Sequence, residues 1–223
     1  TVASAMCGEE VAENTVLVGI GGRYEWKNKG IDVFIDALDK LNHTDFKGKS
    51  VHAFIMIPSG HNGPDKQLLA KLAGNGSGYV TRTSHYLMNP EYDNVTRRLN
   101  DLHFNNAAGD KVKVYFIPSY LNGNDGIFNM PYYDLLSGLD LTLFPSYYEP
   151  WGYTPLESVA FGVPTVTTTL AGFGMWVAKQ AEHKGVDIVR RDDYNTREVV
   201  LQITDILKHY MDMSAEEYAE ARK

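Results

Sequence analysis

The residues best suited to chemistry lie in one aromatic-rich stretch, Phe144–Ser158. Its prolines, its glycine and its large aromatic residues disrupt regular periodicity, so most of it is expected to be loop. Two glutamates, Glu149 and Glu157, stand in this stretch, but their spacing alone is a weak indication in an acidic chain. Glu157 also has a structural explanation, because Thr154-Pro-Leu-Glu157 matches a helix capping box with proline at the first helical position. Glu149 has no such explanation, since it lies mid-loop beside Pro150.

A second candidate is the basic stretch Gly21–Gly30, which follows a short apolar run. The Arg23 guanidinium and the Lys29 ammonium flank a tight connection into a helix, and together they would suit a diphosphate. The helix N-terminus adds an anion preference of roughly 0.3–1 kcal/mol. Trp151-Gly-Tyr-Thr154 offers further backbone amides at another helix start. The alternative is a solvated basic loop, and the G-x-G-x-x-G spacing of a dinucleotide site is absent.

Aromatic side chains flank a third polar loop, where Tyr120 and Tyr132 stand on either side of residues 122–126. These rings could stack on a nucleotide base, or they could simply pack the loop. The 7 histidines show no metal-ligand spacing, and no D-x-D pair is present to bridge a metal to a diphosphate. We interpret the aromatic-rich stretch as a sugar-nucleotide site that requires no metal and no other cofactor.

The elements that must position these residues alternate between strand and helix. Apolar runs predict strands at 15–20, 51–57, 111–117, 139–144, 164–168 and 185–189. Helical spacing predicts helices at 30–41, 65–73, 92–104, 132–137, 155–162, 173–182, 196–211 and 215–222, the last with a capping box at Ser214 and Glu217. Such strands are too apolar for a one-sided sheet, so the pattern predicts an α/β fold with a doubly wound parallel sheet. The three loops follow strands and should converge at the carboxyl edge of the sheet.

Length and composition agree with one globular domain. The chain has 223 residues and a net charge of −7, which argues against a general nucleic-acid or membrane partner. The single cysteine, Cys7, fits a reducing compartment, so we expect a cytoplasmic protein. Residues 1–14 have no clear period and are expected to be a lead-in segment, with one Rossmann-like nucleotide-sugar domain over 15–223. Because the chain begins at Thr1, it could be a piece of a longer protein.

Several motifs together resemble the animal and fungal type of glycogen synthase. The longest is Phe144-Pro-Ser-Tyr-Tyr-Glu-Pro-Trp-Gly-Tyr-Thr-Pro155. The others are Gly22-Arg-Tyr-Glu-Trp-Lys-Asn-Lys-Gly30, Asp110-Lys-Val-Lys-Val114, Pro118-Ser-Tyr-Leu121 and Thr165-Val-Thr-Thr-Thr-Leu-Ala-Gly-Phe-Gly174. The likeness runs from about residue 15 to the end. It implies the C-terminal, donor-binding half of a GT-B glycosyltransferase that elongates α-1,4-glucan with retention, from UDP-glucose or ADP-glucose.

The resemblance also implies roles for individual residues. Glu149 would be the catalytic residue near the anomeric carbon, where it stabilises positive charge on the sugar or shapes its pocket. The remaining candidates would bind the donor: Arg23 and Lys29 the diphosphate, Tyr132 and Tyr120 the uracil, the amides of Gly152, Tyr153 and Thr154 the phosphates, and Glu157 the ribose or its surroundings.

The chain departs from the family in two respects. The N-terminal domain, which would hold the glucan acceptor, is absent, so we expect no glucan elongation by this chain alone. The final helix is acidic where the eukaryotic members carry an arginine-rich sensor of glucose 6-phosphate, which predicts an unregulated, divergent member. Another sugar-nucleotide transferase or epimerase, and a non-catalytic nucleotide- or glucan-binding module, stay open, as do donor base and homo-oligomer formation.

Overall fold

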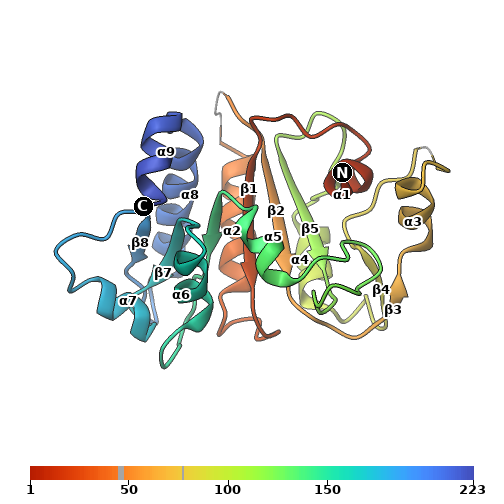
Figure 1. Cartoon of the computed structure of the whole chain (residues 1–223). Helices are drawn as coiled ribbons and strands as arrows, with labels where there is room; N and C mark the ends of the chain where they lie inside the picture. Colours follow the sequence, from red (N-terminus) through yellow and green to blue (C-terminus); the bar gives the residue numbers. More distant parts are fainter. Residues whose placement is uncertain (45–47, 77) are drawn as a thin grey trace.

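A six-stranded parallel sheet forms the centre of the molecule (Figure 1). The structure is a computed structural model, and it describes residues 1–44, 48–76 and 78–223. The strands are β1 (Val16–Gly21), β2 (Val51–Met56), β5 (Val112–Ile117), β6 (Leu141–Leu143), β7 (Thr165–Thr168) and β8 (Val186–Val189), in the order β5-β2-β1-β6-β7-β8. All neighbouring pairs are parallel. The expected α/β fold with a doubly wound, Rossmann-like sheet is confirmed.

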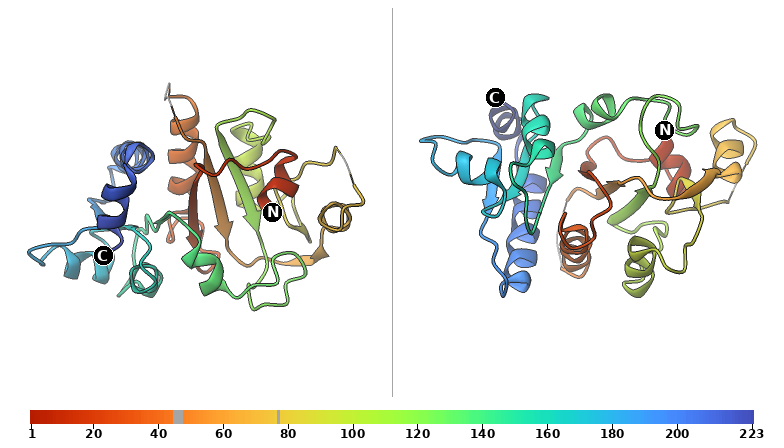
Figure 2. Two further views of the ribbon diagram at one scale, coloured as in Figure 1. Left: turned by 45° about the horizontal axis from the view of Figure 1, so that its top comes forward. Right: turned by 90° about the horizontal axis from the view of Figure 1, so that it is seen from below.

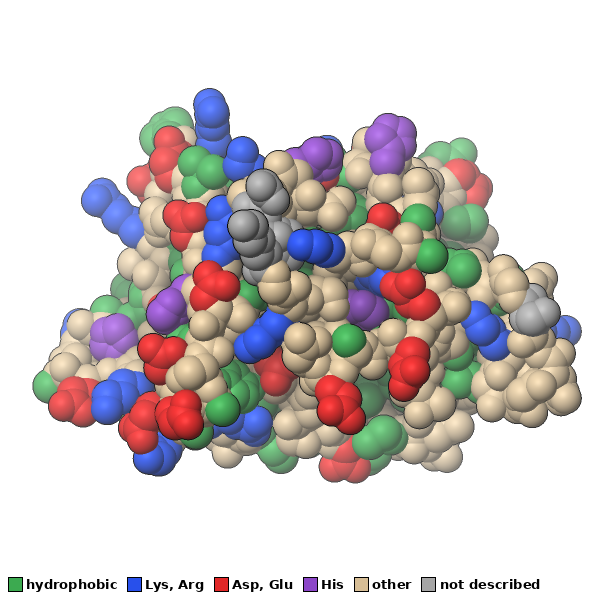
Figure 3. Space-filling model, turned by 90° about the horizontal axis from the view of Figure 1, so that it is seen from above, with side chains coloured by type: hydrophobic (Ala, Val, Ile, Leu, Met, Phe, Trp, Pro, Cys, Tyr) green, Lys and Arg blue, Asp and Glu red, His purple; other side chains and the backbone are tan. Residues whose placement is uncertain are grey.

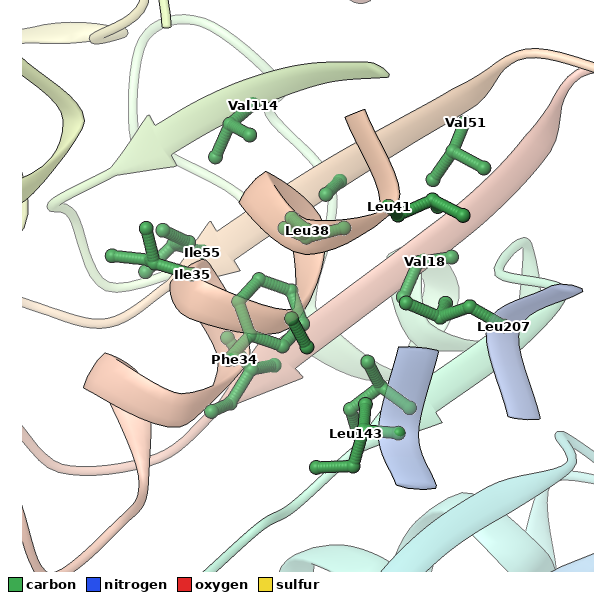
Figure 4. Packing of buried hydrophobic residues seen from close by; sticks show 14 of the residues in the cluster. Val18, Phe34, Ile35, Leu38, Leu41, Val51, Ile55, Val114, Leu143 and Leu207 are labelled. Atoms are coloured by element: carbon green, nitrogen blue, oxygen red, sulfur yellow. The ribbon is translucent and has the colours of Figure 1, made fainter. Parts of the chain in front are cut away.

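Helices cover both faces of this sheet, which is why its strands are largely buried (Figure 2). One face carries α2 (Ile31–Asn42), α4 (Asn94–Asp101) and α8 (Thr196–Asp212). The largest buried cluster lies there, and Figure 4 shows Phe34 and Leu38 of α2 over the strands, with Leu207 of α8 to one side near Val18. Truncation of one such leucine to alanine costs about 2–5 kcal/mol. This cluster fixes α2, and therefore the loop that leads into it.

The opposite face contains the lead-in segment, which the sequence did not predict to be helical. Residues Val2–Cys7 form α1, whose Met6 and Cys7 are buried against α3 (Lys66–Leu72) and β5. Six residues are too few to display a helical period, so tertiary packing decides the structure here. The same face carries α5 (Tyr132–Ser137) and α6 (Tyr153–Ala160), while α7 (Gly172–Val177) lies beside β7.

A small antiparallel ribbon was also missing from the prediction. Its strands are β3 (His61–Pro64) and β4 (His85–Leu87), which are too short and too polar to give a strand signal. The C-terminal helix α9 (Ala215–Ala221) begins at Ser214 with the predicted capping box to Glu217. Among the described residues, no helix is long and apolar enough to cross a membrane.

The candidate loops emerge where the strand order reverses. The chain leaves β1 toward β2 on one side and leaves β6 toward β7 on the other, although β1 and β6 are neighbours. In such a sheet the loops at the switch point diverge at the carboxyl edge, which the right-hand view of Figure 2 faces. At the opposite edge, where the strands begin, acidic and basic side chains are interspersed (Figure 3).

Candidate functional site

The loops after β1 and β6 meet through one ion pair. The Lys29 ammonium contacts Oε1 of Glu149, and the two side chains are only 12% and 13% exposed. The backbones meet as well, because the Tyr147 amide donates to the Asn28 carbonyl at 2.8 Å. Gly30 closes the contact: its φ is 69°, and a Cβ there would overlap the carbonyl oxygen of Pro145. Close approach of the two loops therefore requires glycine at this position.

The backbone of Glu149 is also held from the side of β7. Its amide donates to the Leu170 carbonyl at 3.1 Å, and its carbonyl accepts from the Gly172 amide at 3.1 Å. The Phe173 amide donates to the Trp151 carbonyl at 2.6 Å, which joins the next part of the loop to α7. An irregular loop held by main-chain bonds on both sides can keep a carboxylate in a fixed place. Glu149, predicted to be catalytic, therefore stands on a rigid support.

Arg23 lies in the same basic loop but does not reach Glu149 in this structure. Its side chain is 81% exposed, and Nη2 pairs with Oε1 of Glu25 at 2.8 Å. The side-chain amide of Asn28 donates a hydrogen bond to Glu25 at 2.8 Å. This bond, and to a smaller extent the charge of Arg23, lowers the pKa of Glu25 below its ordinary value. Exposed ion pairs of this kind contribute about 0–1 kcal/mol, so the guanidinium can exchange its partner for a bound anion at little cost.

Helix α6 begins at this loop, at the carboxyl edge of the sheet. Its N-cap is Gly152 with a φ of 99°, and no side chain within the described residues caps the helix. The amides of Tyr153 and Thr154 belong to the first turn, whose N–H groups have no intrahelical acceptor. The Tyr153 side chain is 70% exposed. The amides that were predicted to face an anion thus stand at an uncapped helix start.

The predicted capping box at Thr154 and Glu157 is wrong. The left-handed backbone of Gly152 starts the helix at Tyr153, two residues before the predicted start at Pro155. Thr154 is therefore inside the helix, where its side chain cannot serve as the N-cap. Glu157 instead accepts a hydrogen bond from the Tyr133 hydroxyl at 3.0 Å. Glu157 therefore has no capping role, and its carboxylate contacts Tyr133 instead.

The two predicted base-stacking tyrosines have different environments. Tyr120 is 75% exposed. Tyr132 is half-buried, and a Cβ on Gly21 at the end of β1 would lie 2.6 Å from its hydroxyl oxygen. That hydroxyl is buried and has no hydrogen-bond partner in the described part of the chain. Burial, followed by the charge of Glu157, raises the pKa of Tyr132 well above its ordinary range. An unpaired buried hydroxyl is costly, so the free chain carries an unsatisfied polar group at the end of β1.

Tyr133 is a member of the site that the sequence analysis missed. Its ring stacks on Phe161 with centroids 5.0 Å apart and planes 7° from parallel, and its hydroxyl orients Glu157. The hydrogen bond to Glu157 raises the pKa of Tyr133. The only available signal was its place beside Tyr132 in an aromatic doublet. Among the described residues, no group of three or more His, Cys, Asp or Glu side chains could hold a metal ion.

Comparisons with known proteins agree on one family. A family model described as "Glycogen synthase" matches residues 9–77 and 67–222. Glycogen [starch] synthase isoform 1 of Saccharomyces cerevisiae is 28% identical over 92% of this chain and 39% of its own length. The Caenorhabditis elegans enzyme is 27% identical over 91% of this chain and 39% of its own length, and the mouse liver enzyme is 27% identical over 87% and 36%. The chain thus spans about two fifths of the length of these relatives.

Two solved structures support the fold. An apo structure of OtsA matches 95% of this chain and 40% of its own with a TM-score of 0.56 and 12% identity. The N-terminal domain of a Candida albicans trehalose-6-phosphate phosphatase matches 94% of this chain and 37% of its own with a TM-score of 0.52 and 12% identity. At such low identity, these matches concern the fold alone.

Proposed function

Because this chain belongs to the glycogen synthase family, as its motifs predicted, we propose that it is the donor-binding part of a retaining glucosyltransferase. It binds UDP-glucose and, with a second domain that holds the glucan acceptor, extends α-1,4-glucan as half of a GT-B enzyme. The observation that carries the proposal is the Lys29–Glu149 pair at the switch point of the sheet. Ligands of such sheets bind at this switch point. The Lys29 ammonium there suits the negative diphosphate of the donor, and the Glu149 carboxylate suits the sugar, where positive charge develops during transfer.

The diphosphate lies between the basic loop and the start of α6 in this proposal. Lys29 and Arg23 supply positive charge, and the amides of Gly152, Tyr153 and Thr154 supply hydrogen bonds and the positive end of the helix dipole. As the glucose–phosphate bond breaks, UDP leaves with growing negative charge, and these groups stabilise it without reorganisation. We propose that they replace a metal ion in this role.

Glu149 exchanges its partner when the donor binds. In the free chain its carboxylate and the Lys29 ammonium compensate each other in a largely buried place. A bound diphosphate attracts the ammonium, and the carboxylate then faces the sugar. There it stabilises the positive charge that develops at the anomeric carbon, while the fixed loop backbone supplies the alignment.

The nucleoside lies beside α5 in this proposal, on the other side of the site from Glu149. Tyr120 and Tyr132 contact the base, the exposed Tyr120 directly and the half-buried Tyr132 through the accessible part of its ring. Glu157, held by Tyr133, contacts the ribose. The reaction takes place in the cytoplasm in this proposal, in agreement with a free, buried Cys7.

Calorimetric titration with UDP, ADP and their glucose conjugates tests the proposal. We expect binding of UDP-glucose, and failure of every one of these nucleotides to bind would contradict the donor-site assignment. Incubation of the chain alone with UDP-glucose and a glucan primer tests the need for a second domain. We expect no elongation, and measurable transfer would show that the acceptor site is already present.

A further inference from the structure

Behind the two loops stands a buried arginine that the proposed function does not use. Arg191 follows β8 by two residues and is 5% exposed. Its Nη1 donates to the Pro145 carbonyl, and its guanidinium carbon lies 5.4 Å from the centroid of the Tyr147 ring. Both contacts fall on the loop that ends in Glu149. Arg191 thus holds this loop from two strands away in the sheet.

The Pro145 carbonyl is the point at which three loops join. Arg191 donates to it from the β8 side, and Gly30 contacts it from the β1 side, where a Cβ would overlap it. The Tyr147 amide, two residues later, bonds to the Asn28 carbonyl beside Lys29 at 2.8 Å. A shift of Pro145 would therefore move Lys29 and Glu149 relative to each other.

Packing alone does not require a cation in this place. The Nε of Arg191 is buried without a hydrogen-bond partner in the described residues, and burial lowers the pKa of the guanidinium. The charge of Asp32, which pairs with Lys27 at 2.6 Å, opposes that shift. An apolar side chain of similar length would fill the space without the cost of desolvating a charge. The guanidinium offers instead a directed bond to Pro145 and a face for Tyr147.

We propose that Arg191 is a positioning residue for the sugar end of the donor site. It fixes the loop from Pro145 to Glu149 so that Glu149 meets the glucosyl group when Lys29 turns to the diphosphate. In the part of the chain that the structure describes, Arg191 makes no hydrogen bond or ring contact with the tyrosines proposed to hold the base, so its effect is specific to the sugar. This inference rests on the proposed function of the Lys29–Glu149 pair.

The test compares two ligands on the same variants. Calorimetry measures Kd for UDP-glucose and for UDP on the chain, on Arg191→Gln and on Arg191→Lys. We expect Arg191→Gln to raise the ratio of the UDP-glucose Kd to the UDP Kd about tenfold, the typical effect of losing a hydrogen bond to a charged group. Arg191→Lys, which keeps the charge but lacks the planar fork, should fall in between. The matched control is Arg190→Gln, an adjacent exposed arginine, which should leave the ratio unchanged.

The outcomes separate this inference from the function on which it rests. An unchanged ratio, whether both affinities fall by the same factor or neither changes, would overturn the inference and show that Arg191 acts only on stability. The same conclusion would follow if neither Arg191 variant folded, as judged by thermal unfolding. Failure of the unmodified chain to bind either ligand would overturn the proposed function, and with it this inference.

Discussion

Lys29 and Glu149 are 120 residues apart in the chain, yet they form an ion pair in which both side chains are nearly buried. The first follows β1 and the second follows β6, so the reversal of the strand order brings them together. A buried pair is costly to build and more costly to break singly, since the remaining charge has no compensation. Such a pair fits a site that is prepared for a charged ligand.

The first prediction concerns the stability of this pair. Lys29→Met and Glu149→Gln should each lower the free energy of unfolding by about 1–3 kcal/mol. Each substitution leaves the remaining charged side chain largely buried without its partner. The double variant should lose less than the sum of the two. Urea unfolding of all four proteins gives the coupling energy. Strict additivity would mean that the two charges do not interact.

A second prediction concerns chemistry in the complete enzyme. Glu149→Gln should lower kcat by about 10²–10³-fold, since it removes a charge that acts on the transition state. The affinity for UDP should change little, because the base and phosphate contacts remain. Steady-state kinetics with UDP-glucose, together with UDP titration, checks both parts. Full activity of the variant would favour the alternative of a non-catalytic binding module.

A third prediction uses the contact between Gly21 and Tyr132. A methyl group added at Gly21 would lie 2.6 Å from the tyrosine hydroxyl, so Gly21→Ala must displace this ring. We expect a loss of about 1–3 kcal/mol in stability and weaker binding of UDP. Gly138→Ala is the control, because its Cβ would meet only the Leu135 carbonyl at 3.4 Å. Undiminished affinity of Gly21→Ala for UDP would separate Tyr132 from the base site.

The dependence of stability on pH gives a fourth prediction. Burial, with a smaller effect from the charge of Lys113, lowers the pKa of His52 from 6.5 to about 4. The unfolded chain therefore takes up this proton below pH 6.5 while the folded chain does not, so stability falls as the pH drops from 6.5 toward 4. The full loss is about 3 kcal/mol, because each pKa unit of the shift corresponds to about 1.36 kcal/mol.

Urea unfolding at pH 7 and pH 4.5 measures this loss. Carboxylates with lowered pKa values, such as Glu9, contribute in the same direction, so a variant must isolate the histidine. His52→Gln keeps a polar group near the Tyr115 hydroxyl, which lies 2.9 Å from Nδ1 of His52. The variant should show a smaller difference between the two pH values. An equal difference would assign the effect to other groups.

The sequence predicted the sheet well because most of its strands are mainly apolar, and a glycine or proline stands at or just after the ends of β1, β2, β5 and β6. A run such as Val51–Met56 fits few structures other than a buried strand. Because the strands are parallel, the loops that follow them must lie at the same edge of the sheet. The sequence predicted the start of α6 poorly. Thr154 and Glu157 satisfy the capping pattern, yet the left-handed Gly152 begins the helix earlier. Here the local capping pattern gave the wrong helix start, because the left-handed conformation of Gly152 depends on tertiary contacts.

Side-chain environment was the other limit of sequence reasoning. Nothing in the sequence distinguishes the exposed Tyr120 from the half-buried Tyr132, because the difference depends on how α5 packs on Gly21. Nor could it find Arg191, which stands beside the exposed Arg190 in the same basic doublet. Such residues act through contacts across several strands, and only the folded chain displays those contacts.

The central claim is that the Lys29–Glu149 pair marks the donor site, and titration of UDP-glucose into Lys29→Met tests it most directly. We expect the affinity to fall at least tenfold relative to the unmodified chain, because the diphosphate loses a charge-assisted contact. Lys40→Met, which removes an exposed lysine from the last turn of α2, should bind like the unmodified chain. Equal affinity of Lys29→Met and Lys40→Met for UDP-glucose would contradict the claim.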